Sequence, residues 1–391
     1  MMKTQHHHQN QKKLGRRKDE KVDKLVVDQL PTDLEVEILA RLPAKSLMKV
    51  QCVSKMWSSI IRSQRFVDSF YALSSTRSRF TVTFCNADAE RLFIYSSSFE
   101  EEERSLVAKL QMTIPSVDLI YGFKSPSVHG FLGCCSGDQF IVCNPTTRQV
   151  ISLPIKTARA SLGYDPVGRQ FKALNLVSPP DLFPAFLVHE AITFEGGGGR
   201  VSRKQVTSAP YYPVTDGLYI NGSIYYAAWA RSQKRDPVVV CFDVRSDNIS
   251  FIKAPWEVVA CDSDSILIDY RGKLASIIVD AYSPFQIFGL WILEDALKHE
   301  WSNQTFELPF PLLNMTSPGT NKAGDIIFAP TYLPPVATFF FLYYYNVENQ
   351  LIRSVRLHGV ADDEDFQRRY GLLDYCYVNI SPEHVESIAS L

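Results

Sequence analysis

Few residues of this chain have the types and the spacing that catalysis requires. Ser46 and Lys49 match the Ser-x-x-Lys spacing of acyl-transfer enzymes. The run Gly196 to Gly199 has the composition of a phosphate-binding loop, but Arg200 and Val201 follow it, so the Walker-type pattern is absent. Ser46 falls within a short predicted helix. We interpret the first match as coincidence and the second as a flexible loop.

Histidines and cysteines do not form a pattern typical of metal or triad chemistry. His129, His189 and His299 have no cysteine or acid at ligand or triad spacing, which favours structural roles for them. The three residues His6 to His8 favour a polar tail over a weak metal site. The eight cysteines include no Cys-x-x-Cys pair, and we expect reduced thiols inside a cell. We therefore predict no enzyme activity, no cofactor and no metal site.

Three short helices are predicted for the stretch from Leu30 to Phe70. Thr32 and Glu35 have the spacing of a capping box, which predicts a helix start. Leu34, Ile38 and Leu42 recur every four residues and share one face. Pro43 should end this helix, because it lacks an amide proton and disfavours helical dihedrals at the preceding residue.

The second and third helices add more apolar side chains. Leu47 and Val50 belong to the second helix, and Ser54 can cap a third that carries Trp57, Ile60 and Ile61. About forty residues in three small helices cannot bury this much apolar surface among themselves. The surplus either packs on the rest of the chain or is kept for a partner.

The stretch resembles the F-box motif, the module that docks on the Skp adaptor of cullin-type ubiquitin ligases. Four groups carry the resemblance: Leu30 to Leu34, Glu37 to Leu39, Arg41 to Leu47 and Val53 to Trp57. Met56 departs from the family pattern, where a basic residue is common, and Lys49-Val50 replaces the usual Arg-Phe. The resemblance implies Skp contacts from Leu30, Pro31, Leu34, Ile38, Leu42, Pro43, Leu47, Val50, Val53 and Trp57.

From about Arg77 the pattern changes to short apolar runs separated by turn residues. The predicted strands include 80–84, 140–143, 238–242, 266–268 and 339–345. Asn221-Gly222 has the composition of a two-residue hairpin turn. Gly222, Gly272 and Gly324 open similar hairpins and lie 50 and 52 residues apart, and Gly130 opens another upstream. A repeat of this length without long helices is typical of a kelch-like β-propeller.

The predicted fold is therefore mainly β, with a small all-α module followed by a β-propeller of about six blades. Five or seven blades remain open, and an irregular β-sandwich is the alternative. Seven segments resemble the F-box-associated (kelch-like, type 3) propeller domain of plant F-box proteins: 129–135, 144–154, 163–174, 219–228, 267–277, 290–302 and 384–388. We expect a basic leader over 1–27, an F-box over 28–72 and the propeller domain over 77–391.

Loops on a rigid propeller commonly carry recognition, although plain connection is the alternative for each of them. Four predicted loops interrupt the strands, at 179–184, 195–200, 231–236 and 314–322. The cluster Arg231, Lys234 and Arg235 is the candidate for meeting an acidic surface on a target protein.

Charge and hydropathy limit the remaining possibilities. The formal net charge is -1 over 391 residues, which argues against a nucleic-acid partner. The leader lacks an apolar core, so we expect no secretion signal. Its cluster Lys12 to Lys18 is either a nuclear address or a solvated tail. The most apolar run, 336–345, is too short for a membrane-spanning helix and predicts a buried strand. We expect a soluble protein of the nucleus, the cytoplasm or both.

The F-box resemblance implies a substrate-recognition adaptor of a Skp–cullin–F-box (SCF) ubiquitin ligase. The F-box would hold Skp and, through it, the cullin and RING subunits, while the propeller would hold an unknown target for ubiquitination and degradation. A Skp-binding scaffold without degradation is one alternative. A propeller enzyme is the other, and it would need converging carboxylates or a metal cluster on one face.

Overall fold

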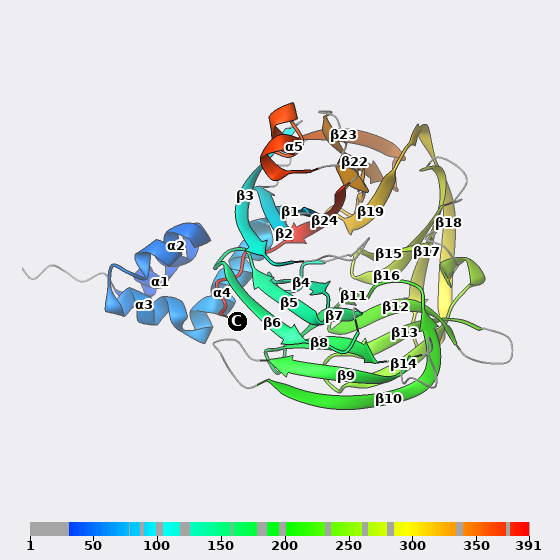
Figure 1. Cartoon of the computed structure of the whole chain (residues 1–391), viewed down its shortest axis with the longest axis horizontal. Helices are drawn as coiled ribbons and strands as arrows, with labels where there is room; N and C mark the ends of the chain where they lie inside the picture. Colours follow the sequence, from blue (N-terminus) through cyan, green and yellow to red (C-terminus); the bar gives the residue numbers. More distant parts are fainter. Residues whose placement is uncertain are drawn as a thin grey trace, which may run out of the picture.

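A computed structural model describes residues 31–390, apart from 78, 87–89, 99–104, 118–125, 158, 178–185, 195–200, 231–235, 260–264, 280–284, 334–338 and 373–375. A small helical module lies at one side of a larger β-domain (Figure 1). The mainly β fold with an N-terminal helical module is the one predicted from the sequence. The basic leader and its lysine and arginine cluster lie outside the described residues.

Four helices form the module, one more than predicted. They are α1 (Thr32–Arg41), α2 (Ala44–Val50), α3 (Lys55–Arg62) and α4 (Gln64–Ser74), followed by a 3-10 turn over Ser75–Arg77. Pro43 ends α1 as expected, because Leu42 is extended with ψ of 145°. Ser63 caps α4 by accepting a hydrogen bond from the Phe66 amide at 3.3 Å. Helix α4 was not predicted, because its Ser-x-x-Phe start lacks the acidic residue of a capping box.

The predicted capping box at the start of α1 is wrong. Pro31 occupies the N-cap position, and no side chain caps the helix. The Glu35 carboxylate faces α3 instead, where its Oε1 accepts a hydrogen bond from Trp57 Nε1 at 3.3 Å. This bond links the first helix to the third, and only the tertiary fold could reveal it.

The strands group into six antiparallel units, which we call blades 1 to 6. Blade 1 contains β1 (Arg79–Asn86), β2 (Arg91–Ser98), β3 (Ser105–Pro115) and β24 (Cys376–His384). Blade 2 contains β4 (Leu132–Ser136), β5 (Gln139–Asn144) and β6 (Gln149–Pro154). Blade 3 contains β7 (Ala160–Asp165), β8 (Gln170–Val177), β9 (Phe186–Phe194) and β10 (Ser202–Pro213).

The other three blades repeat this order. Blade 4 contains β11 (Leu218–Ile220), β12 (Ser223–Ala230), β13 (Asp236–Asp243) and β14 (Asn248–Lys253). Blade 5 contains β15 (Ser265–Tyr270), β16 (Lys273–Val279), β17 (Phe285–Asp295) and β18 (Glu300–Leu312). Blade 6 contains β19 (Met315–Thr320), β20 (Ile326–Pro330), β22 (Phe340–Asn346) and β23 (Leu351–His358). The remaining elements are a 3-10 helix over Trp256–Val259, β21 (Tyr332–Leu333) and α5 (Glu364–Tyr370).

The blades form a ring around a shared centre. Their inner strands contact one another in the order β4, β7, β11, β15, β19 and β24 (Figure 1). The ring is closed in blade 1, where β24 pairs with β1 although nearly 300 residues separate them, as in Val82 opposite Ile380. Closure covers an edge that would otherwise be free to pair with another chain. Outer strands β23 and β3 of neighbouring blades also pair, in parallel.

The repeated glycines lie at equivalent positions, as their spacing indicates. Gly130, Gly222, Gly272 and Gly324 have φ between 80° and 88°, a region that disfavours other residues. The turns at Gly222, Gly272 and Gly324 join the first strand of a blade to the second, whereas the turn at Gly130, between Val128 and Phe131, leads into β4. Because strands alternate in direction, the turn between the third and fourth strands lies at the same end of the blade. We call this end of the ring the turn face, and the opposite end, with the segments 155–157 and 214–217, the loop face.

One predicted loop is a strand. Residues 314–322 contain Pro318 and Gly319, which led us to expect a connection, but residues 315–320 form the inner strand β19. A register shift between Thr316 and Gly319 accommodates both residues, and Ser317 Oγ donates to the Ile327 carbonyl at 2.8 Å. Predicted strands 80–84, 140–143, 238–242 and 266–268 are confirmed, and 339–345 is confirmed as β22 with a start at Phe340.

Two buried histidines predict that the protein loses stability in weak acid. Burial lowers the pKa of His189 and of His384 to about 4, from 6.5. The unfolded chain therefore binds more protons than the folded chain between pH 6.5 and 4, so their contribution is complete above pH 6.5 and falls as pH drops. The contribution of each histidine to the free energy of unfolding should decrease by up to about 1.4 kcal/mol for every pH unit below 6.5 in this window. Urea unfolding at pH 6.5, 5.75 and 5 measures the slope, and a flat profile would contradict it. In His384→Gln, which can still bond Ser127, the slope should decrease.

Candidate functional site

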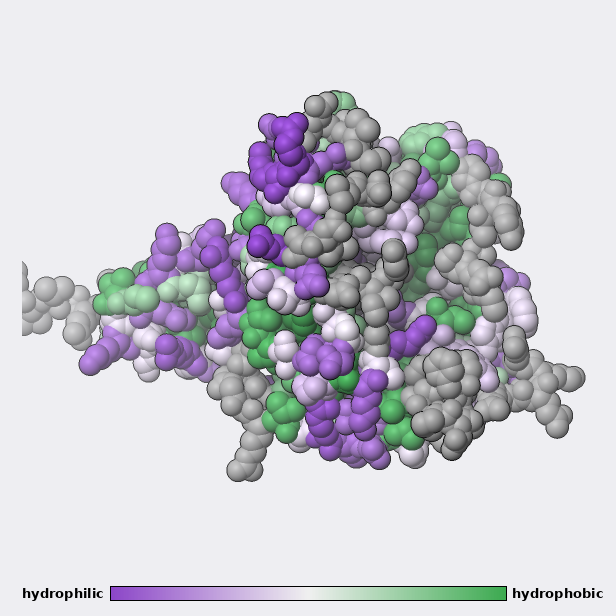
Figure 2. Space-filling view, in the orientation of Figure 1, coloured by the Kyte–Doolittle hydropathy of each residue, from purple (hydrophilic) through white to green (hydrophobic). Residues whose placement is uncertain are grey.

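The helical module exposes an apolar surface formed by Leu34 and Ile38 of α1 and by Val53 and Met56 near the start of α3. Their exposed fractions are 48%, 53%, 72% and 46%. We call these four residues the apolar surface. Leu34 and Ile38 are one helical turn apart on the same side of α1. Hydrophobic side chains are visible on the surface of the module in Figure 2.

The helices hold these side chains outward because other residues fill the interior. Leu39, Ala44, Leu47, Ile61, Phe66 and Phe70 form the buried core of the module. Trp57 packs against this core through its ring while its Nε1 bonds Glu35. The apolar surface is therefore not needed to close the core, which favours the hypothesis that it serves a partner.

The structure places most of the predicted Skp-contact residues at or near the surface. Pro31 and Pro43 are exposed, whereas Leu42, Val50 and Trp57 are half-buried against the core. Leu30 lies outside the described residues. Met56, which departs from the family pattern and was not among the predicted contacts, also lies on the surface, three residues after Val53.

The predicted contact from Leu47 needs correction. Its exposed fraction is 0%, and it belongs to the core of the module, so its side chain has no surface to offer a partner. Ala44, which is equally buried, lies three residues earlier on the same face of α2. This spacing was a sequence signal for an inward-facing pair.

The helical module packs on the turn face of the propeller through α4. Tyr71 stacks on His129 with ring centroids 3.7 Å apart, and Asp68 lies 2.9 Å from Arg169. Lys322 Nζ donates to the carbonyl of Ser75. His129, Arg169 and Lys322 belong to turns of blades 2, 3 and 6, so the module contacts several blades at once.

The segment 385–390, which follows the last strand of the propeller, contacts both the helical module and the propeller. Ile388, 6% exposed, belongs to the core of the helical module. Asn144 Nδ2 donates to the carbonyls of Ser387 at 2.9 Å and Ala389 at 3.1 Å. Gly130 approaches this segment so closely that an added Cβ would lie 2.5 Å from Ser387 Cβ. The segment thus lies between the turn face and the helices.

The predicted target-binding residues Arg231, Lys234 and Arg235 lie outside the described residues, as do the predicted loops 179–184 and 195–200. In the described part of the chain, no group of three or more His, Cys, Asp or Glu side chains is arranged to hold a metal ion. The seven cysteines placed there are free thiols. None of the helices in the described ranges is long and apolar enough to cross a bilayer.

The histidines noted for possible chemistry have structural contacts. His129 lies between the rings of Tyr71 and Tyr164, with centroid distances of 3.7 and 3.9 Å. His189 is buried between the Val206 carbonyl and the Tyr211 hydroxyl. His299 has a φ of 58° at a turn, and its Nδ1 accepts a hydrogen bond from the Lys253 amide.

Comparisons with known proteins agree with this architecture. Residues 27–69 match the F-box domain, and residues 79–385 match the F-box associated beta propeller domain. The F-box protein At1g30790 of Arabidopsis thaliana is 49% identical over 93% of this chain and 99% of that protein. The putative F-box protein At1g32660 of the same plant is 44% identical over 90% of this chain and 82% of that protein. Among solved structures, the WD40 domain of SCAP from fission yeast aligns with a TM-score of 0.34 and 9% identity, over 72% of this chain and 87% of that chain.

Proposed function

Since this chain belongs to the plant F-box proteins that carry an F-box-associated β-propeller domain, we propose that it is a substrate-recognition adaptor of an SCF ubiquitin ligase. The F-box docks on a Skp-family adaptor, which connects it to the cullin and RING subunits. The propeller holds a target protein for ubiquitination and proteasomal degradation. The adaptor supplies proximity and no catalytic group, because it raises the effective concentration of a target lysine near the conjugating enzyme.

The apolar surface of the helical module carries this proposal. Leu34, Ile38 and Val53 stay exposed while the module fills its core with other side chains. Covering them with a partner would remove apolar area from water at about 25 cal/mol per Å². The module packs on the turn face, which leaves the loop face clear for a target. The domain boundaries that we propose remain 1–27, 28–72 and 77–391, with segment 385–390 contacting both folded domains.

Ile38→Glu should weaken binding of the Skp adaptor at least tenfold. The change places an unpaired carboxylate in an apolar contact, which costs several kcal/mol before relaxation. Because Ile38 is exposed, the variant should keep its fold. Titration calorimetry of purified full-length protein with a Skp adaptor measures the effect. Leu297→Glu, at an exposed turn of blade 5, is the matched control and should bind like wild type. Equal affinity of Ile38→Glu and wild type would contradict this placement of the contact.

The scaffold alternative differs from this proposal in the fate of the target. A cycloheximide chase on a target found by pull-down compares wild type with Ile38→Glu. Under the degradation proposal, wild type shortens the lifetime of the target and Ile38→Glu protects it. If the lifetime is the same with both, the scaffold without degradation takes its place. The propeller enzyme, the other alternative, would need converging carboxylates or a metal cluster on one face.

A further inference from the structure

The loop face has two adjoining hollows at the centre of the ring. The larger, about 130 Å³, is lined by apolar side chains that include Leu218, Leu267, Pro318 and Ile380. The smaller, about 60 Å³, lies beside it and is lined by Cys135, Arg159 and Tyr226. Both share Pro126 and the segment Thr215 to Gly217, so they open into a single mouth, which we call the channel mouth.

The channel mouth lies on the opposite side of the ring from the helical module. Its wall consists of residues near the starts of inner strands β7, β11 and β19 and of the segment 214–217, which joins blade 3 to blade 4. These lie at the loop face, whereas α4 contacts turns of the turn face. A protein held at the channel mouth would therefore leave the apolar surface of the F-box free.

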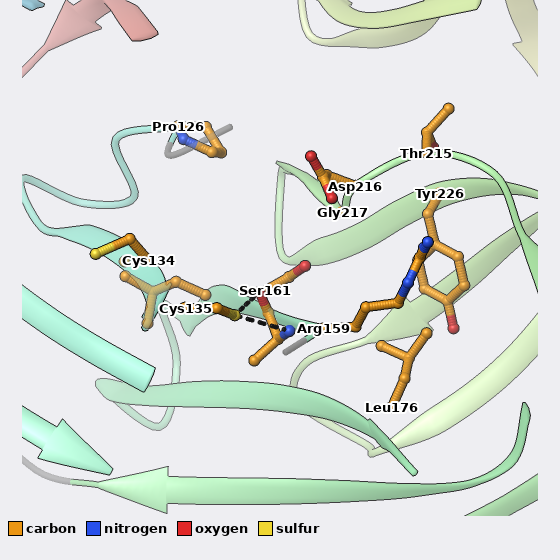
Figure 3. Close-up of a pocket in the computed structure, with 13 residues that line it drawn as sticks. Pro126, Cys134, Cys135, Arg159, Ser161, Leu176, Thr215, Asp216, Gly217 and Tyr226 are labelled. Atoms are coloured by element: carbon orange, nitrogen blue, oxygen red, sulfur yellow. Dashed lines mark hydrogen bonds between the residues drawn. The ribbon is translucent and has the colours of Figure 1, made fainter. Parts of the chain in front are cut away.

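Two opposite charges at the channel mouth have no partner within the described residues. The Asp216 carboxylate and the Arg159 guanidinium line the smaller hollow, and neither is bonded to another described side chain. Figure 3 shows Arg159 extending alongside Tyr226, while Asp216 projects from its loop. Both side chains are solvent-exposed. A ligand that removes water from them must supply opposite charges, because a desolvated charge without a partner is costly.

The size of the hollows indicates what kind of ligand fits. Pockets for free small molecules usually measure about 300 to 1,000 Å³, larger than either hollow. A cavity of about 150 Å³ holds a benzene ring, so the larger hollow suits one apolar side chain. These dimensions favour single side chains presented by a larger partner.

We propose that the channel mouth binds an extended segment of the target protein. One apolar side chain of that segment enters the larger hollow, a neighbouring lysine or arginine pairs with Asp216, and an acidic side chain meets Arg159. This inference rests on the proposed adaptor function and names the recognition surface and the chemistry of the target segment.

A synthetic array of acetylated octapeptides tests the proposal with the purified full-length protein. Each peptide keeps a central leucine, and the flanking positions are scanned with Lys, Arg, Asp, Glu and Gln. The expected hits carry a basic residue on one side of the leucine and an acidic residue on the other. Fluorescence anisotropy with the best peptide should show binding at least tenfold tighter than its Lys→Gln version.

Two variants and a control test which residue of the channel mouth recognises each charge of the peptide. Asp216→Asn should weaken the best peptide at least tenfold and remove the preference for a basic residue, and Arg159→Gln should remove the preference for an acidic one. Asp138→Asn, also exposed but outside both hollows, is the matched control and should bind like wild type. Circular dichroism confirms that each variant is folded.

Two results would overturn the proposal: no peptide bound above background, or a basic preference that survives in Asp216→Asn. The Skp titration is a separate measurement on the same variants. Normal Skp binding with a failed array rejects only the channel mouth, and failed Skp binding by wild type rejects the adaptor function.

Discussion

In Ile388→Asp, the helical module should lose its ordered packing while the propeller stays folded. Segment 385–390 contributes Ile388 to the core of the helices, the buried cluster that also contains Leu39, Leu47 and Phe66. Truncation of a buried isoleucine to alanine costs about 2 to 5 kcal/mol, and a buried carboxylate adds a desolvation cost. This approaches the whole stability of a small helical unit.

Hydrogen exchange followed by mass spectrometry measures this effect separately in each part of the chain. Amides of α1 to α4 should exchange at least tenfold faster in Ile388→Asp, and those of β12 and β16 should be unchanged. Ser390→Asp adds the same charge two residues later, at an exposed position, and should behave like wild type. If the helices keep their protection in Ile388→Asp, this segment does not support the module.

Asp247→Asn should destabilise the propeller by roughly 3 to 5 kcal/mol. Lys172 is 5% exposed, and its ammonium bonds Asp247 Oδ1 and lies 3.5 Å from the Arg245 carbonyl. The substitution leaves the ammonium buried without its carboxylate. Asparagine suits the φ of 57° at this position, so backbone strain should not contribute. Urea unfolding at pH 7.5 measures the loss.

A second substitution separates the ion pair from other effects. In the double variant Lys172→Met with Asp247→Asn, no buried charge remains unpaired, and most of the lost stability should return. Lys204 bonds the other oxygen of Asp247 at 3.0 Å, but its side chain is 62% exposed. Lys204→Met should therefore cost less than about 1 kcal/mol. A double variant as unstable as Asp247→Asn would mean that the buried ammonium is not the cause.

Local residue chemistry predicted much of this fold. Pro43 restricts its own backbone and that of its neighbour, so it marks the end of α1 wherever the helix packs. Gly222, Gly272 and Gly324 have positive φ, and their spacing revealed the repeated blades. Leu34 and Ile38 could be assigned to one helical face from their spacing alone.

The features that the sequence analysis missed depend on contacts between distant residues. The Glu35 carboxylate has the position of a capping group, but the Trp57 indole lies close enough to compete for it. Leu47 belongs to a family motif, yet it faces the core. The contact of Ile388 with helices more than 300 residues earlier has no local signal. No local sequence pattern marks Asp216 or Arg159 as part of a site, because only the folded ring brings their two loops together.

The position of Ile388 also orders events during translation. The four helices are complete at residue 74 and emerge from the ribosome first, but a side chain of their core is synthesised more than 300 residues later. At roughly 5 to 20 residues per second, this delay lasts some tens of seconds. A nascent chain therefore exposes an unfinished F-box throughout elongation. The packing of the F-box is completed only after the strands of all six blades have been made. A chain with a fully packed F-box therefore already carries its complete propeller.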